Sequence, residues 1–262
     1  ARLGGVERFF SREEKILLKP NLLRKAAPES AVVTHPAVVS AMAELLLEAG
    51  CRKLSYGDSV GAGSMEKIAE GCGLADAMKE LAIPMADFNA CVRTEYPEGK
   101  MARRFHMAKA VTEADALLNL SKMKTHQLER MTGAVKNMYG CIQGLHKAKG
   151  HTRYSNAESF ARMLVDLNRY VRPRLYVMDG ITAMEGNGPA SGNPVAMGVM
   201  LISADPVALD SVCCSLMHLK PDLVPTNVQG AKMGLGVWKD DAIDVITREG
   251  ILSPLQAGER YG

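Results

Sequence analysis

The sequence predicts an α/β fold with a mainly parallel sheet and helices on both faces of that sheet. Short apolar runs alternate with longer segments that show helical periodicity. These runs have the character of buried strands, whose two faces are both covered. With 262 residues, of which 47% are hydrophobic and 23% are charged, the chain has ordinary globular composition. We expect a single domain over residues 1–262, with a small β-rich lobe at 83–110.

The first β-α-β unit is expected at the start of the chain. A strand that begins at Lys15 is closed by Lys19-Pro20-Asn21, because Pro20 forces Lys19 out of the helical region. A helix over 37–49 follows, with Thr34 as its N-cap. The second strand, 52–56, is closed by Gly57-Asp58-Ser59.

The same alternation continues to the end of the chain. Further strands are expected at 83–89, 91–95, 105–109, 116–120, 174–178, 195–203 and 242–246. Further helices are expected from Met65, and at 75–81, 110–115, 133–139, 155–170, 207–218 and 226–233. Asp205 is expected to cap the helix over 207–218.

Polar residues stand where these strands end. In an open α/β sheet, ligands bind outside the carboxyl ends of the strands. The sequence therefore indicates ligand-binding residues at the first two strand ends and in the loop between them: Lys19, Asn21, His35, Asp58 and Ser59.

The basic segment 119–153 follows the strand at 116–120. It holds seven lysines and arginines against one acid, Glu129. Lys122, Lys124 and His126 alternate, so they share a face if the strand continues. Two ammonium groups would hold a carboxylate or phosphate and would lower the pKa of His126, so that a neutral imidazole acts as acid or base. The alternative is a solvated turn.

Lys136 and Asn137 lie on the short helix expected from Gly133. The N-terminus of that helix would add backbone donors for the same anion. The alternative is a surface lysine. We expect the second half of the segment, with His146 and His151, to be a mobile basic flap.

Asp179 and Glu185 supply the acidic side of the predicted site. A carboxylate at the end of a strand can bind a divalent metal or transfer a proton, and Asp179 is counted with Lys124 and His126 as catalytic. The alternative for Asp179 is a turn former. His126, His146 and His151 match no zinc signature, so structural or exposed histidines are the favoured interpretation.

The six cysteines contain no Cys-x-x-Cys pair, which argues against an iron–sulfur cluster or zinc ribbon within these residues. Reduced thiols favour a cytoplasmic location. No apolar run reaches about 18 residues, so no membrane span is predicted. The net charge of +3 does not imply nucleic acid, and aromatic residues are scarce in the basic segment.

The chain resembles the DUF362 family, whose uncharacterised proteins are often labelled iron–sulfur cluster-binding. The resemblance covers most of the chain and rests on Leu-Lys-Pro-Asn at 18–21, Thr-His-Pro at 34–36, Gly-Asp-Ser at 57–59, Asn-Leu-Ser-Lys-Met-Lys-Thr-His at 119–126, Thr-Gly-Ala-Val-Lys-Asn-Met-Tyr-Gly at 132–140, Asp-Gly-Ile-Thr-Ala-Met-Glu-Gly-Asn-Gly-Pro at 179–189 and Ala-Asp-Pro-Val-Ala-Leu-Asp at 204–210. Some members add a ferredoxin-like domain with cysteine motifs that this sequence lacks. More distantly, residues 132–136 are similar to a stretch of lactate racemase-type proteins, which handle small hydroxy acids.

Three functions remain open from the sequence. The first is an enzyme that binds a small anionic metabolite in a cleft lined by Lys, His and Asp. The second, implied by the resemblance, is a redox module that works with a ferredoxin-like domain or protein. The third is a nucleic-acid-binding module, for which only the basic segment argues.

Overall fold

The centre of the structure, a computed structural model that describes residues 3–61 and 63–262, is a six-stranded sheet. Its order is β2-β1-β5-β7-β8, and β6 pairs with the outer part of β5. The strands are β1 (Ile16–Pro20), β2 (Leu54–Tyr56), β5 (Ala116–His126), β6 (Arg130–Thr132), β7 (Leu175–Glu185) and β8 (Asn193–Ser203). Strands β1, β2, β5 and β7 are parallel, which confirms the mainly parallel sheet.

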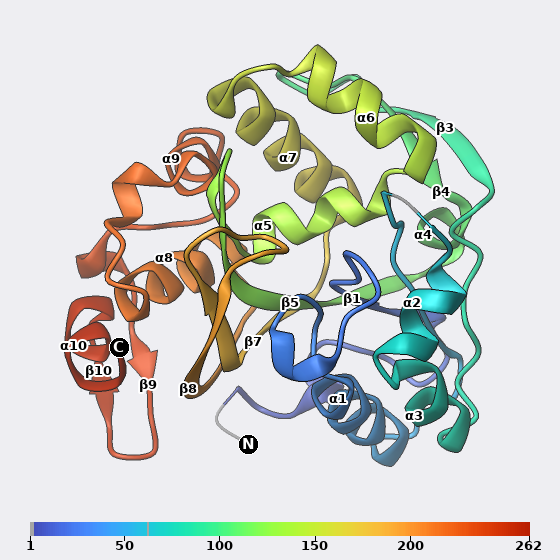
Figure 1. The fold of residues 1–262 in the computed structure, drawn as a ribbon, viewed down its shortest axis with the longest axis horizontal. Coiled ribbons are helices and arrows are strands. Elements are labelled where there is room, and N and C mark those ends of the chain that lie inside the picture. The colour runs from blue at the N-terminus through green and yellow to red at the C-terminus, as the bar shows by residue number, and fades with distance from the viewer. Residues whose placement is uncertain (1–2, 62) are drawn as a thin grey trace.

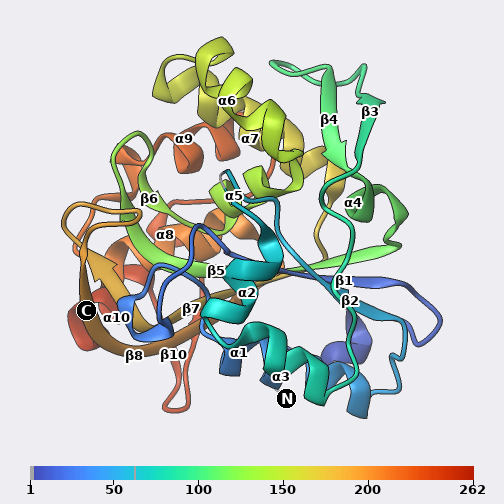
Figure 2. The ribbon, with the colours of Figure 1, turned by 45° about the vertical axis from the view of Figure 1, so that its right-hand side comes forward.

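Helices cover both faces of this sheet, as predicted. Helices α1, α2 and α3 lie on one side, and α5 and α7 lie on the other (Figure 1, Figure 2). The helices are α1 (Pro36–Glu48), α2 (Met65–Gly71), α3 (Leu74–Glu80), α4 (Lys109–Glu113), α5 (Ala134–Asn137), α6 (Gly144–Arg153), α7 (Ala157–Val171), α8 (Pro206–Leu216), α9 (Pro225–Lys232) and α10 (Pro254–Tyr261). Among the helices described, none combines the length and the apolar character that crossing a bilayer requires.

Two small antiparallel sheets complete the fold. Strands β3 (Cys91–Glu95) and β4 (Arg104–Ala108) form a hairpin, and β9 (Val245–Ile246) pairs with β10 (Ile251–Leu252). The strand expected at 83–89 is reduced to one parallel bridge, between Met85 and Tyr56 of β2. The rest of it does not form, because Asp87 accepts hydrogen bonds from the N–H groups of Asn89 and Ala90 and makes a turn there. The single-domain division with a lobe at 83–110 stays a prediction.

Strands β5 and β7 run six or seven residues further than the sequence indicated. Strand β6 folds back on β5 from Lys124 to His126, and β8 runs antiparallel along β7 as far as Glu185. This pairing carries the strands past their apolar runs. Residues expected just beyond the strand ends, such as Lys122 and Asp179, therefore lie within the sheet.

The structure tests the expected N-caps of two helices, α1 and α8, and the flap expected in the second half of the basic segment. Thr34 is not the N-cap of α1, because its hydroxyl donates to the carbonyl of Leu120 and accepts from the N–H of Asn21. His35 takes that place, and its Nδ1 accepts from Ala37. Asp205 caps α8 as predicted. The expected basic flap is helix α6, whose N-cap is Gln143.

Candidate functional site

Five lysines come together where β1 and β5 meet α5 and α6. Burial is complete for three of them, whose exposed fractions are 0% for Lys19, 0% for Lys122 and 1% for Lys124. Lys136 of α5 and Lys147 of α6 are partly exposed. The charges of neighbouring lysines are among the causes that lower the pKa values of Lys124, Lys136 and Lys147, which places the five groups within electrostatic reach of each other. We call these five residues the lysine cluster.

Lys19 is paired with Asp58. Its Nζ lies 2.9 Å from Asp58 Oδ1, an ion pair without hydrogen-bond geometry, while Asp58 Oδ2 accepts from the N–H of Leu22 at 2.8 Å. Gly140 permits this approach. A Cβ at that position would lie 1.8 Å from Asp58 Oδ1 and 2.5 Å from Lys19 Nζ. The Lys19–Asp58 pair therefore depends on a glycine in the turn after α5.

Lys122 is paired with Asp179. Their Nζ and Oδ2 atoms are 2.7 Å apart, and both side chains are at most 1% exposed. Asp179 also accepts from the N–H groups of His35, at 2.8 Å, and Ile181, at 3.2 Å. Lys19 and Lys122 thus each have a carboxylate partner that is distant in sequence.

A chain of side-chain amides connects Lys124 to α5. The Lys124 ammonium donates to Val32 O at 2.6 Å and to Asn21 Oδ1 at 2.7 Å. Asn21 Nδ2 donates to Asn137, whose own amide nitrogen donates to Asn119 at 2.6 Å. Asn119 then donates to the carbonyl of Ala134. The structure therefore brings together the predicted residues Lys124, Asn21 and Asn137.

Burial and the charges of Lys136 and Lys122 lower the pKa of Lys124 well below that of a surface lysine, although Asp58 acts in the opposite direction. The side chain has two neutral acceptors and no carboxylate partner. Its nitrogen has a third position that either a proton or the lone pair can occupy. Lys124 therefore differs from Lys19 and Lys122, which are paired with carboxylates.

His126 lies at the end of β5 with its Nδ1 facing the backbone. That atom accepts from the N–H groups of Leu128, at 3.2 Å, and Glu129, at 3.3 Å. Burial, together with the charges of Lys136 and Lys124, lowers the pKa of His126 to about 2. The ring is therefore neutral, and its proton sits on Nε2. In this state the imidazole is a hydrogen-bond donor.

Glu129 is a residue that the sequence reasoning passed over. Its side chain is fully buried, and neither carboxyl oxygen has a hydrogen-bond partner among the described residues. Burial raises the pKa of Glu129 to about 8, against the charge of Lys136. The Lys136 ammonium forms no hydrogen bond or ion pair with any described residue, and burial lowers its pKa to about 8. The run of seven basic residues around a single acid was the signal that could have singled it out.

Lys147 was also missed, since the expectation placed it in a flap. Its ammonium donates to the carbonyl of Ser59, and its own carbonyl accepts from the hydroxyl of Tyr139 at 2.7 Å. Burial lowers the pKa of Lys147 to about 8. Ser59 thus contributes its backbone to the site.

The N-terminus of α5 is not available to a ligand. Its first two N–H groups, those of Ala134 and Val135, donate to the carboxylate of Asp210 at 2.6 and 3.1 Å. A Cβ on Gly133 would lie 2.3 Å from that carboxylate. Asp210 thus caps α5 from α8, and the expected backbone donors are occupied.

The structure separates the two predicted metal ligands. Asp179 is enclosed by its donors, whereas Glu185 is exposed at the far end of β7. The cysteines do not fit an iron–sulfur cluster either. Five of the six are buried, and of these only Cys213 and Cys214, which are neighbours on α8, are adjacent in sequence.

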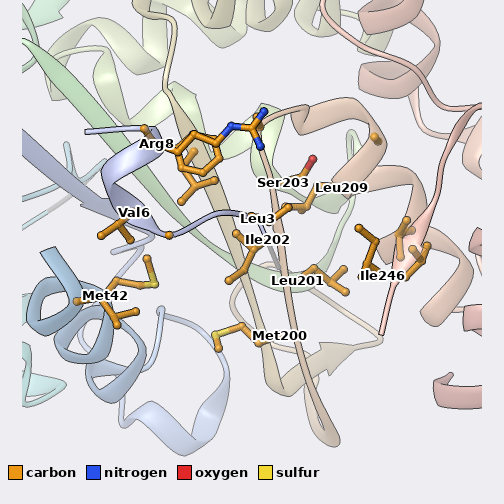
Figure 3. Close-up of a pocket in the computed structure, with 18 of the residues that line it drawn as sticks. Leu3, Val6, Arg8, Met42, Met200, Leu201, Ile202, Ser203, Leu209 and Ile246 are labelled. Atoms are coloured by element: carbon orange, nitrogen blue, oxygen red, sulfur yellow. The ribbon is translucent and has the colours of Figure 1, made fainter. Parts of the chain in front are cut away.

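A separate cavity of about 790 Å³ lies beside β8 (Figure 3). It is lined mainly by apolar side chains of the N-terminal segment, α1 and β8, among them Val6, Met42, Met200 and Ile202. None of its lining residues belongs to the lysine cluster.

Comparison with known proteins agrees with this picture of the fold. The model of the DUF362 family, a domain of unknown function, matches residues 16–215. A curated relative, the thylakoid-associated protein sll1697 of Synechocystis sp., is 36% identical over 234 residues, which cover 89% of this chain and 72% of the relative. The lactate racemase apoprotein of Thermoanaerobacterium thermosaccharolyticum is similar in structure, with a TM-score of 0.50, 11% identity and 78% of this chain covered. The match spans only 49% of that racemase chain, so the likeness concerns the fold.

Proposed function

The chain belongs to the DUF362 family, and from that premise we propose that it is an enzyme that binds a small carboxylate or phosphate metabolite at the lysine cluster. One observation carries the proposal. Lys124, Lys136 and Lys147 form no ion pair with any described carboxylate, although Lys124 is buried and the other two are half-buried. Buried positive charges are costly unless something compensates them. A bound anion would supply that compensation.

The anion is expected beside Lys136 and His126. The Lys136 ammonium lacks a protein partner in the described chain, and the charge of Lys136 is one of the causes that lower the pKa of His126. A neutral ring with its proton on Nε2 adds a hydrogen bond without adding charge. Two such donors suit one carboxylate or one phosphate group.

Lys124 is the proposed acid–base residue of the reaction. Its lowered pKa lets the amine release a proton more readily than a surface lysine does. Asn21 and Asn137 hold that amine in place. Asp58 and Asp179 stabilise Lys19 and Lys122, and so they support the site without binding a metal.

The alternatives receive less support. Lys19, Lys122 and Lys124 are buried, so a nucleic-acid backbone could not reach them without unfolding part of the sheet. The redox alternative rests on the resemblance, and the described cysteines do not assemble a cluster. A ferredoxin-like partner would have to bring its own cysteines.

The proposal is tested with two anions on the same protein. Inorganic phosphate and lactate are titrated into the wild-type chain and the variants Lys136→Met and His126→Asn in a calorimeter. Wild-type protein should bind one of the two anions. Lys136→Met should weaken that binding at least about tenfold, because a charge-assisted hydrogen bond contributes about 1.5–3 kcal/mol.

Lys67→Met is the matched control, since Lys67 is an exposed lysine on α2. It should bind the anion as tightly as the wild-type protein. Circular dichroism shows whether each variant is folded. Failure of both anions to bind the folded wild-type protein, or equal weakening by Lys67→Met, would overturn the proposal.

A cytoplasmic location is part of the same proposal. All six cysteines are free thiols, which is the usual state of cysteines in a reducing compartment. Cell fractionation tests this point. Recovery of the protein in the membrane pellet, where a thylakoid-associated protein would be found, would count against it.

A further inference from the structure

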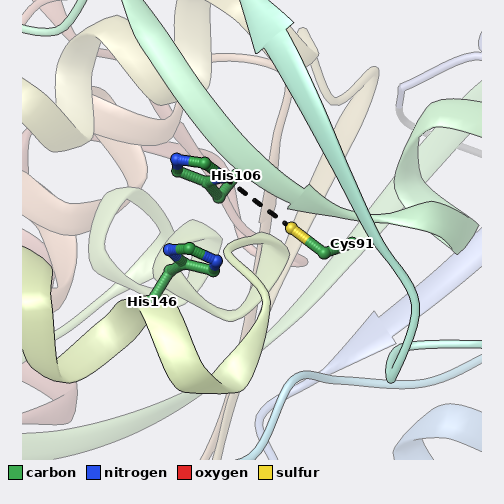
Figure 4. Close-up of side chains that lie close together, drawn as sticks. All are labelled: Cys91, His106 and His146. Atoms are coloured by element: carbon green, nitrogen blue, oxygen red, sulfur yellow. Dashed lines mark hydrogen bonds between the residues drawn. The ribbon is translucent and has the colours of Figure 1, made fainter.

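Cys91, His106 and His146 form a cluster of possible metal ligands, and none of the three belongs to the lysine cluster. Cys91 and His106 lie on one face of the β3–β4 hairpin. Cys91 is paired with Ala108 of β4, and His106 is two residues from Ala108 on the same strand, so its side chain points to the same face. His146 comes from the first turn of α6. Figure 4 shows the three side chains converging from these elements.

The local fold holds α6 against the hairpin. Gln143 donates its backbone N–H to the carbonyl of His106 at 2.9 Å, and Ile142 forms an antiparallel bridge with Met107. The side-chain amide of Gln143 donates to the carbonyl of Asn89. These bonds fix the start of α6 directly beside β4, so His146 meets His106 for a structural reason.

The geometry of the three side chains suits a metal ion. Their ligand atoms all lie within 4.8 Å of one another, and Cys91 Sγ is 3.9 Å from His106 Nδ1. In a tetrahedral zinc site, metal–ligand distances of about 2.3 Å to sulfur and about 2.05 Å to nitrogen place the ligand atoms about 3.3–3.6 Å apart. The sulfur and the first nitrogen are thus within a few tenths of an ångström of that spacing.

The imidazole rings require one adjustment. They are stacked, with centroids 3.8 Å apart and planes 3° from parallel. A metal lies in the plane of each ring that binds it, so His146 must rotate about its side-chain bonds for both nitrogens to converge. Its ring nitrogens hold no hydrogen bond to any residue that the structure describes, so the rotation breaks only the stacking on His106.

The charges around the cluster favour the neutral form of the His106 ring. Burial, together with the charges of His146, Arg93, Lys149 and Arg104, lowers the pKa of His106. Arg93 and Arg104 both donate to Glu95, which offsets part of their positive charge. Neutral imidazole and thiolate are the forms that bind transition metals.

We propose that Cys91, His106 and His146 bind a divalent transition-metal ion of the zinc class. One thiolate and two imidazoles are borderline-soft ligands that zinc prefers. Three protein ligands leave the fourth position of a tetrahedron to water or to a small ligand, and Cys91 is exposed on that side. The ion would link β3–β4 to α6 and hold the helix that carries Lys147.

Zinc and cobalt ions are the probes for this site. Tag-free, chelator-treated protein is titrated with ZnCl₂ in a competition assay against a chromophoric chelator, and with CoCl₂ under anaerobic conditions in an absorption spectrometer. One equivalent of each ion should bind, and the cobalt complex should show a sulfur-to-cobalt charge-transfer band. Cys91→Ser should abolish that band.

His106→Gln and His146→Gln should each weaken zinc binding at least about tenfold, since even indirect supports of a metal site are worth about 10–100-fold. His218→Gln is the matched control, because His218 is an exposed histidine outside the cluster. It should bind zinc as the wild-type protein does. Unchanged zinc affinity in both cluster histidine variants, or a cobalt spectrum that survives Cys91→Ser, would overturn the proposal. Each variant's unfolding curve in EDTA shows that it remains folded.

Discussion

Replacing Asp179 with Asn should destabilise the protein strongly, because it leaves the Lys122 ammonium buried without a countercharge. The two charged atoms are 2.7 Å apart, and both side chains are at most 1% exposed. Removing one partner of such a pair costs about 3–5 kcal/mol. Two backbone N–H groups also donate to the Asp179 carboxylate, and an amide cannot accept from all three donors. We therefore expect a loss in the upper half of that range.

A double-mutant cycle measures the interaction between Lys122 and Asp179 separately from the other contacts of each side chain. Lys122→Met alone leaves a buried carboxylate, whereas Lys122→Met/Asp179→Asn removes both charges. The double variant should be more stable than either single variant by about 2 kcal/mol, because neutral replacement of a buried pair costs little. The measurement is urea unfolding followed by circular dichroism, with the midpoint compared at constant slope.

The exposed pair of Lys109 and Glu113 provides the control for this cycle. Its atoms are 3.4 Å apart, and the side chains are 47% and 57% exposed. Glu113→Gln should cost less than about 0.5 kcal/mol. The reasoning is refuted if Asp179→Asn stays within about 1 kcal/mol of the wild type, or if the losses of the two single variants simply add.

Three further predictions concern the pH dependence of stability and the room for a side chain at Gly140. Folded protein holds a proton on Glu129 up to about pH 8, whereas the unfolded chain releases it near about 4.3, so stability should fall across that window by up to about 1.4 kcal/mol per pH unit. Glu129→Gln should remove this part of the slope. His126 has a pKa of about 2 in the folded protein and about 6.5 in the unfolded chain, so stability should fall as pH drops below about 6.5, and His126→Asn should reduce that loss. Gly140→Ala should cost about 1–3 kcal/mol, because its Cβ would lie 1.8 Å from Asp58 Oδ1.

Each of these predictions has a contrasting measurement. Urea midpoints at several pH values give the slopes. An unaltered profile in Glu129→Gln would contradict a protonated Glu129 in the folded protein, and an unaltered profile in His126→Asn would contradict a neutral His126. Gly61→Ala is the control for Gly140→Ala, because a Cβ at position 61 has no described atom within 4 Å outside the residues adjacent to it. Equal stability of the two alanine variants would contradict the steric argument.

The sequence predicted the scaffold well because its signals are local. The apolar run before Lys19 and the helical periodicity of 37–49 depend on neighbours along the chain, and both elements form as expected. The length of β5 could not be predicted in this way. Lys122 and Lys124 look like the polar residues of a loop, and only partners distant in sequence, Asp179 and Asn21, allow them to remain inside a sheet.

The sequence indicated several of the residues that lie together in the candidate site, but not which of them are paired with a carboxylate. Lys19, Asn21, Asp58 and Lys124 do assemble, because parallel strands deliver their carboxyl ends to the same edge. Which of them carry a free charge depends on long-range pairing. Asp210 shows the limit most plainly, since its position on α8 gives no local sign that it caps α5.

The amide chain between Lys124 and α5 has a direction. An ammonium group can only donate, so Asn21 must turn its oxygen toward Lys124, and each following amide must then give its nitrogen to the next oxygen. The series ends at the carbonyl of Ala134, which can only accept. Reversing one amide would oppose two donors or two acceptors, so the three asparagines are oriented together. The direction in which Lys124 donates at one end of this chain is thereby coupled to the first turn of α5 at the other.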